Sequence, residues 1–195
     1  MRRALVVRAF ALMLPLISFA VVADEGSLIA GVFSPPRLAP DFSLSGSDGT
    51  TLMLSRYRGK VVLLSFGYTY CTEVCPITLG VLAMARRKLN ARAADLQVLY
   101  ITVDPDRDDA ARMRQYLTAF DPSFVGGTGT PQQLAAVRRD YGISVGKKTP
   151  VPGGYALSHS SFIYLIDRSG ALKALMPFGH NADDFVHDVR LLLEK

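Results

Sequence analysis

Residues 61–76 read VVLLSFGYTYCTEVCP and predict a buried strand that leads, through a short turn, into a helix. The first six residues are almost all apolar, which is typical of a strand buried on both faces. Pro76 suits the first position of a helix, because the amide hydrogen that proline lacks is unpaired there in any case. We expect this helix to run to about residue 90, with Cys75 as its N-cap and Cys71 in the preceding turn.

A second buried strand is expected beyond this helix, at residues 96–103. A strand, a helix and another buried strand imply a right-handed parallel crossover. The pattern that follows is typical of an amphipathic helix over residues 108–120, with Asp106 or Asp108 as its cap. A further helix is predicted over residues 131–141, where a proline lies at the start and Gly142 ends it.

Two hairpins are predicted outside this centre, each with two short strands around a polar turn. Their strands are expected at residues 42–44 and 51–54, and at residues 162–166 and 171–176. A final helix is expected over residues 182–193, capped by Asn181. Residues 146–154 contain two prolines and three glycines, and we interpret them as a mobile loop.

The order of these elements predicts an α/β protein with a thioredoxin-like fold. The central mixed sheet is flanked by helices, with an added N-terminal β-hairpin and an inserted helical segment. We assign this domain to residues 41–195, preceded by a lead-in or tether over residues 24–40, where Pro35, Pro36 and Pro40 occur. About 150 residues bury roughly 70% of the unfolded surface, so folding needs neither a disulfide nor a metal.

Residues 1–23 have the layout of an export signal. Three arginines precede an uncharged run over residues 9–23, and Val21 and Ala23 fit the small-residue rule for a cleavage site. An uncleaved membrane anchor over residues 4–23 is the alternative, with the Arg8 side chain reaching the membrane surface. Neither cysteine lies near the junction, which excludes a lipoprotein. Both interpretations predict a periplasmic domain in an oxidising compartment.

The charge balance argues against a nucleic-acid partner. The chain has 195 residues, a net charge of +5 and a pI near 9.4. Without the three arginines of residues 1–23, the 22 basic residues become 19 against 17 acidic residues, a net charge of +2. No basic stripe remains to bind a phosphate backbone. Two cysteines and three scattered histidines also cannot supply the four clustered ligands of a zinc ribbon.

Both cysteines lie within five residues, as Cys71-Thr72-Glu73-Val74-Cys75. A helix N-terminus stabilises thiolates, so we expect the pKa of one or both thiols to fall below about 8.5. Such thiols could act as a redox-active pair in disulfide exchange or bind a soft metal such as Cu(I) or Zn(II). A structural disulfide is the third possibility, but so short a loop would add little stability.

His159 is the best candidate for a third metal ligand. It precedes a predicted strand whose start lies at the same sheet edge as the cysteine turn. His180 precedes the predicted cap Asn181 and His187 lies within the last helix, and both are interpreted as structural or solvated. Four scattered methionines are interpreted as core residues rather than copper ligands: Met53, Met84, Met113 and Met176.

The motif FGYTYCTEVCP at residues 66–76 resembles the signature of the Sco/SenC family of copper proteins. Three further stretches resemble family motifs: PDF through DG at residues 40–49, VDPDRD at 103–108, and SHSSFIYLID at 158–167. The resemblance covers about residues 38 to 194 and implies a thioredoxin-like fold. It also implies that Cys71, Cys75 and His159 hold copper, as Cu(I) or Cu(II).

Members of this family deliver copper to the binuclear copper centre of cytochrome c oxidase or reduce its cysteines. The resemblance therefore implies a metallochaperone whose partners are the copper-accepting oxidase subunit and another periplasmic copper chaperone or thiol reductant. Two positions depart from the family pattern. Thr72 replaces a proline, and Ser158 replaces an aspartate that could orient the histidine.

Two other functions use the same cysteines. A periplasmic thiol–disulfide reductase would need no metal and would have no evident use for His159. A thiol peroxidase would share Thr72 and Cys75 but would require a proline where Tyr68 stands. The three aspartates of the 103–108 motif are interpreted as solvated strand-end and helix-cap residues: Asp104, Asp106 and Asp108.

Overall fold

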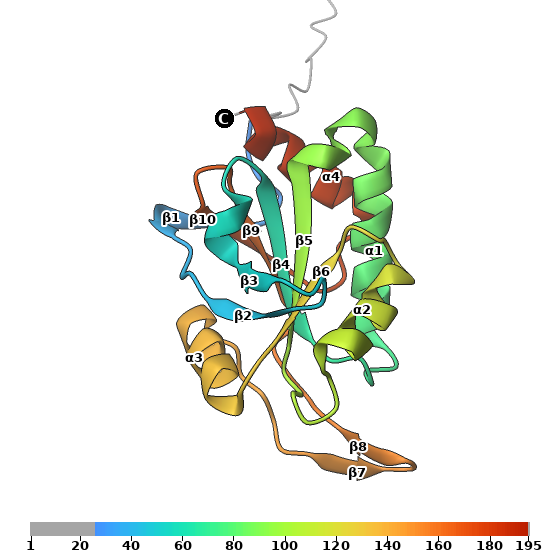
Figure 1. Ribbon diagram of the computed structural model, residues 1–195. Coiled ribbons are helices and arrows are strands. Elements are labelled where there is room, and N and C mark those ends of the chain that lie inside the picture. The colour runs from blue at the N-terminus through green and yellow to red at the C-terminus, as the bar shows by residue number, and fades with distance from the viewer. Residues whose placement is uncertain (1–25, 195) are drawn as a thin grey trace, which may run out of the picture.

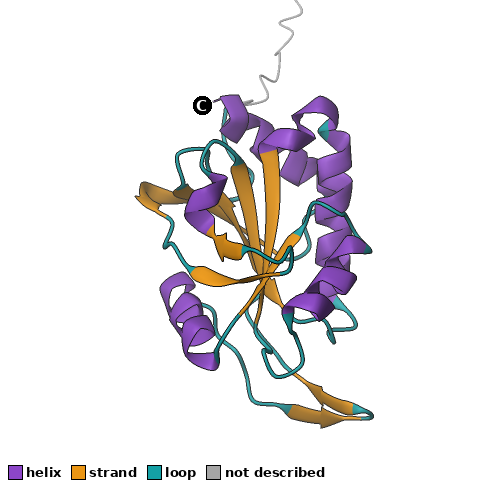
Figure 2. Ribbon diagram, viewed as in Figure 1, coloured by secondary structure: helices purple, strands orange, loops and turns teal. Residues whose placement is uncertain are grey.

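A computed structural model describes residues 26–194, so the predicted signal or anchor over residues 1–23 lies outside the described part. Its centre is an eight-stranded mixed sheet in the order β1-β10-β9-β4-β5-β6-β2-β3 (Figures 1 and 2). The strands of this sheet are β1 (Gly31–Leu38), β2 (Ser43–Gly46), β3 (Thr51–Met53), β4 (Val61–Gly67), β5 (Leu96–Thr102), β6 (Val125–Thr128), β9 (Phe162–Ile166) and β10 (Ala171–Pro177).

The helices confirm most of the predicted pattern. They are α1 (Val74–Lys88), α2 (Ala110–Thr118), α3 (Pro131–Tyr141) and α4 (Ala182–Glu194), with short 3-10 helices at Leu54–Tyr57 and Asn90–Asp95. Gly142 ends α3 in the left-handed conformation, with φ of 68°, as predicted. No helix within residues 26–194 is long and apolar enough to cross a membrane.

The sheet carries a hydrophobic core on each face. Every residue of β4 and β5 is buried, and consecutive side chains enter opposite cores. Leu63 packs with α1 and α4 on one face, whereas Leu64 packs with α3 and the β2–β3 hairpin on the other. Figure 1 shows this division, with α1, α2 and α4 on one side of the sheet and α3 on the other. This is the predicted thioredoxin-like fold.

The prediction of an irregular lead-in over residues 24–40 is wrong for residues 31–38. This segment is β1, which pairs with β10 and forms one edge of the sheet. Its register shifts between Val32 and Arg37, the interval that contains Pro35 and Pro36. Proline is tolerated here because an edge strand has one side free of ladder bonds. The predicted β9–β10 hairpin is present, but it is not the last pair of strands in the sheet, because β1 pairs with the outer side of β10.

Two further expectations need correction. Residues 146–154 were expected to be a loop, but the segment contains β7 (Thr149–Val151), which pairs with β8 (Gly154–Ala156) in a separate two-stranded sheet. In Figure 1 this hairpin projects from the end of the molecule at which α1 begins. The cap of α2 is Asp109, whose side chain accepts the Arg112 N–H at 2.7 Å, and not Asp106 or Asp108.

Candidate metal and thiol site

The two cysteines lie where β4 passes into α1, at a helix start that differs from the prediction. The N-cap is Glu73, so Cys75 is in the first helical turn and is not the cap. Cys75 is only 3% exposed and packs into the core. Pro76 is still tolerated there, because first-turn amides lack helical partners. Cys71 is half-buried, and both cysteines are free thiols.

Hydrogen bonds at the start of α1 favour a thiolate at Cys71. The Cys75 thiol and backbone N–H both donate to the Cys71 sulfur, the latter at 3.4 Å, and lower the pKa of Cys71 to about 5 against the opposing effect of burial. The Glu73 N–H and His159 lower this pKa further. The same thiol–thiolate bond, together with burial, raises the pKa of Cys75. At neutral pH, Cys71 is therefore the nucleophile and Cys75 holds the proton.

His159 is the third predicted ligand, and its side chain contacts Cys75. Its Nε2 lies 3.6 Å from the Cys75 Sγ, and its Nδ1 lies 2.8 Å from the Ser160 carbonyl oxygen. A carbonyl can only accept, so Nδ1 carries a proton and Nε2 is the ring nitrogen that faces Cys75. The Ser160 carbonyl thus orients the imidazole, although Ser158 replaces the aspartate of the family pattern.

Tyr68 connects the cysteine turn to the segment that carries His159. Its ring packs edge-on against the imidazole with centroids 6.0 Å apart, and its hydroxyl accepts the Leu157 N–H at 3.1 Å. Residues 144–146 hold the segment from the other side: Gly146 N–H donates to the Ser158 carbonyl at 2.8 Å. The position of His159 is therefore fixed by neighbours on both sides.

The sheet register brings these distant segments together. β4 pairs with β9 so that Ser65 faces Ile163, and His159 precedes β9 just as Cys71 follows β4. In an antiparallel pair, the end of one strand lies beside the start of the other. A small recess beside Cys75 and His159 is lined in addition by Ser65, Phe66, Val74, Thr78, Tyr100 and Ser161.

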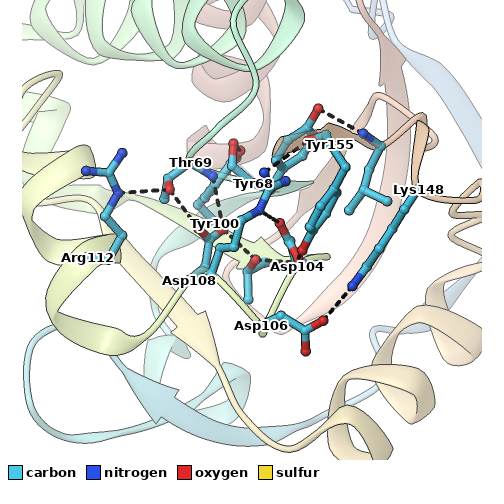
Figure 3. A network of polar contacts seen from close by, with 12 residues as sticks. Tyr68, Thr69, Tyr100, Asp104, Asp106, Asp108, Arg112, Lys148 and Tyr155 are labelled. Carbon is cyan, nitrogen blue, oxygen red and sulfur yellow. Dashed lines mark hydrogen bonds and ion pairs between the residues drawn. The ribbon is translucent and has the colours of Figure 1, made fainter. Parts of the chain in front are cut away.

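The cysteine turn is also held by a buried carboxylate that was predicted to be solvated. Asp108 is fully buried and accepts the Thr69 N–H at 2.9 Å, the Thr69 hydroxyl at 2.6 Å and the Thr102 hydroxyl at 2.7 Å (Figure 3). Asp104 is buried as well, so only Asp106, which pairs with Lys148 at 2.6 Å, is exposed as expected. The pairing of β4 with β5 brings Thr69 and Thr102 to the same carboxylate, and no local sequence pattern indicates this contact.

The other predicted residues lie elsewhere. His180 and His187 pair with Asp184 and Asp188, each at 3.0 Å, as expected of structural residues. Met113 and Met176 are fully buried, but Met84 is 46% exposed and is not a core residue. Within residues 26–194, no three His, Cys, Asp or Glu side chains are close enough to form a complete metal site. Cys75 contacts both Cys71 and His159 and links the three predicted ligands.

A thioredoxin-like sheet with two free thiols at a helix start and an imidazole beside them defines a thiol protein with the donor set of a soft-metal site. The SCO1/SenC family profile matches residues 33–194. The chain therefore belongs to the SCO1/SenC family.

Individual relatives agree with this assignment. The mitochondrial SCO2 homologue of Mus musculus is 37% identical over 155 residues, which is 77% of this chain but 60% of the relative, so the chain spans about three-fifths of that protein. Bradyrhizobium japonicum ScoI, solved with copper bound, is 32% identical, with a TM-score of 0.74 over 80% of this chain and 100% of that structure. Apo Sco1 of Thermus thermophilus is also 32% identical, with a TM-score of 0.76 over 88% of this chain and 100% of that structure.

Proposed function

We propose that this protein binds copper through Cys71, Cys75 and His159 and delivers it to the binuclear copper centre of cytochrome c oxidase. The observation that carries the proposal is the contact of 3.6 Å between His159 Nε2 and Cys75 Sγ. It brings an imidazole nitrogen to a thiol pair that already contains one thiolate. Thiolates suit Cu(I) and imidazole suits Cu(II), so this donor set can accept either state.

Copper binding requires a small rearrangement and the loss of one proton. Cys71 supplies its sulfur as a thiolate, whereas Cys75 must release its proton as it binds the metal. Cys71 and His159, which each contact Cys75, would supply the other two ligands. Cys71 is the more exposed thiolate, so an acceptor cysteine would displace it first and the buried Cys75 last.

Copper titration of the reduced protein tests the proposal, with absorbance to follow Cu(II)–thiolate charge transfer. We expect one copper per chain, and we expect Cys71→Ala and Cys75→Ala each to abolish tight binding while leaving the far-UV circular dichroism intact. His159→Ala should weaken Cu(II) more than Cu(I), since two thiolates satisfy Cu(I). His180→Ala is the matched control and should bind as wild type does. Unchanged Cu(II) affinity in His159→Ala would overturn the assignment.

A second function, thiol–disulfide reduction, is favoured by one specific observation. The pKa of Cys71 is about 5, so this half-buried residue is a thiolate at neutral pH and can attack a disulfide, with Cys75 as the resolving thiol. This activity needs no imidazole ligand. Reduction of a small disulfide should therefore survive in His159→Ala, and loss of both activities together in that variant would argue against two separable functions.

The proposed compartment is the periplasm, with residues 1–23 as a cleaved signal or residues 4–23 as an anchor. The proposed partners are the copper-accepting subunit of the oxidase and a periplasmic copper chaperone or thiol reductant. Fusion of residues 1–30 to a reporter that is active only after export tests the compartment. A reporter retained in the cytoplasm would contradict it, and fractionation would separate the cleaved form from the anchored one.

A further inference from the structure

Arg107 lies between the two segments that carry the proposed copper ligands. Its guanidinium carbon is 4.6 Å from the ring centroid of Tyr70 and 3.6 Å from that of Tyr155. Tyr70 immediately precedes Cys71, and Tyr155 belongs to β8, four residues before His159. A cation stacked between two aromatic rings attracts both of them. Arg107 therefore joins the cysteine turn to the β7–β8 hairpin.

A buried carboxylate fixes the orientation of this guanidinium. Arg107 Nε donates to Asp104 Oδ2 at 2.5 Å, and the Tyr155 hydroxyl donates to Asp104 Oδ1 at 2.6 Å. Arg107 Nη1 also donates to the Tyr155 carbonyl oxygen at 3.0 Å. Figure 3 shows the carboxylate of Asp104 beside Tyr155 at the centre of this network. Asp104 is only 2% exposed, so its carboxylate depends on these donors rather than on water.

We propose that Arg107 is a positioning residue that holds the cysteine turn and the His159 segment at the separation that copper bridges. This inference rests on the proposed copper function. A guanidinium suits the role because its planar fork hydrogen-bonds with its edge while its faces stack on aromatic rings. A lysine would keep the charge but lose the planar stacking.

Two neighbouring cations provide matched controls, because each contacts only one of the two segments. Arg112 stacks on Tyr70 at 4.9 Å and donates to the Thr69 hydroxyl at 3.0 Å, both on the cysteine side. Lys148 stacks on Tyr155 at 4.5 Å, on the hairpin side. Among the described residues, Arg107 is the one cation recorded over both rings. Of these three cations, only Arg107 contacts both segments, so only its replacement should weaken their coupling.

The test compares Arg107→Met with Arg112→Met and Lys148→Met by competitive Cu(II) titration of the full chain. We expect affinity about tenfold weaker in Arg107→Met, equivalent to about 1.4 kcal/mol, and less than a threefold change in either control. The charge-transfer band should also shift in Arg107→Met, because the imidazole no longer meets the metal in the same geometry. If Arg107→Met does not fold, Arg107→Lys takes its place, with a smaller loss of affinity expected.

A double variant and a metal-free measurement complete the test. In the His159→Ala background, Arg107→Met should change affinity less than twofold, because no imidazole remains to be positioned. Without copper, amide hydrogen exchange in the β7–β8 hairpin should quicken at least tenfold in Arg107→Met. Equal affinities in wild type and Arg107→Met, or the full tenfold loss in the His159→Ala background, would overturn the inference. Failure of wild type to bind copper would instead overturn the proposed function and, with it, this inference.

Discussion

Replacing Asp108 with asparagine should destabilise the protein strongly, although the two side chains have nearly the same shape. The carboxylate accepts three hydrogen bonds in a fully buried position, two from Thr69 and one from Thr102. The oxygen of asparagine can keep at most the two bonds made to Oδ2, and its amide group then faces the Thr69 hydroxyl that previously donated. That hydroxyl loses its acceptor.

The magnitude follows from these contacts. Hydrogen bonds to a charged group contribute about 1.5–3 kcal/mol each and neutral ones about 0.5–1.5 kcal/mol, so two weakened bonds cost about 2 kcal/mol together. A buried hydroxyl without an acceptor costs about 1–3 kcal/mol more. We expect Asp108→Asn to lower the free energy of unfolding by at least about 3 kcal/mol, the lower end of this sum. At a urea m-value of about 1–3 kcal/mol/M, this lower limit moves the midpoint down by about 1–3 M.

The neighbouring residue supplies the control. Asp109 is exposed and caps α2, a position where asparagine serves about as well as aspartate. Asp109→Asn therefore makes the same chemical change one residue away and should lower the free energy of unfolding by less than about 0.5 kcal/mol. Urea unfolding followed by circular dichroism compares the two variants. Equal midpoints would refute the argument that the buried carboxylate holds the cysteine turn.

Alkylation of Cys71 by iodoacetamide, located by mass spectrometry, should stay fast from pH 8 down to pH 6 and fall to half near pH 5, because its folded pKa is about 5. In urea, the pH at which the alkylation rate is half its maximum should rise toward about 8.5. A value near 8.5 in the native protein would contradict the thiolate assignment. Gly67→Ala should destabilise the fold by about 1–3 kcal/mol and weaken copper binding, since the added Cβ would lie 2.1 Å from the Tyr100 hydroxyl and 2.9 Å from Cys75 Sγ. Its control is Gly80→Ala in α1, where nothing lies within 4 Å, and equal urea midpoints for the two variants would argue against this steric conflict.

The sequence predicted the central strands well, because burial on both faces leaves a continuous apolar run. β4 and β5 carry that pattern and lie in the middle of the sheet. β6 carries no such pattern and was missed. Its Gly126 and Gly127 leave room for side chains from other elements: an added Cβ would lie 2.8 Å from Met113 Cε and 2.7 Å from Ile101 Cδ1, respectively. Tertiary packing selects glycine here, and no local periodicity records it.

The site was predictable to a similar extent. The spacing of Cys71 and Cys75 and the position of His159 before a strand are local features, and the fold brings them to one edge of the sheet. The burial of Asp108 could not be inferred from its neighbours in the chain, since its partner Thr69 lies 39 residues away. The same holds for the Ser160 carbonyl, whose hydrogen bond to His159 depends on a backbone conformation rather than on a side-chain type.

The separation of 84 residues between Cys75 and His159 determines when the site can form in the nascent chain. At about 5–20 residues per second, the ribosome adds the histidine roughly 4 to 17 s after the second cysteine. During that interval the nascent chain contains a thiol pair with no imidazole beside it, and β9 is not yet available to pair with β4. A charge-transfer signal that depends on His159 can therefore appear only after the last strands have joined the sheet. Copper would then serve as a probe of the final step of folding, in which His159 reaches a thiol pair that was synthesised earlier.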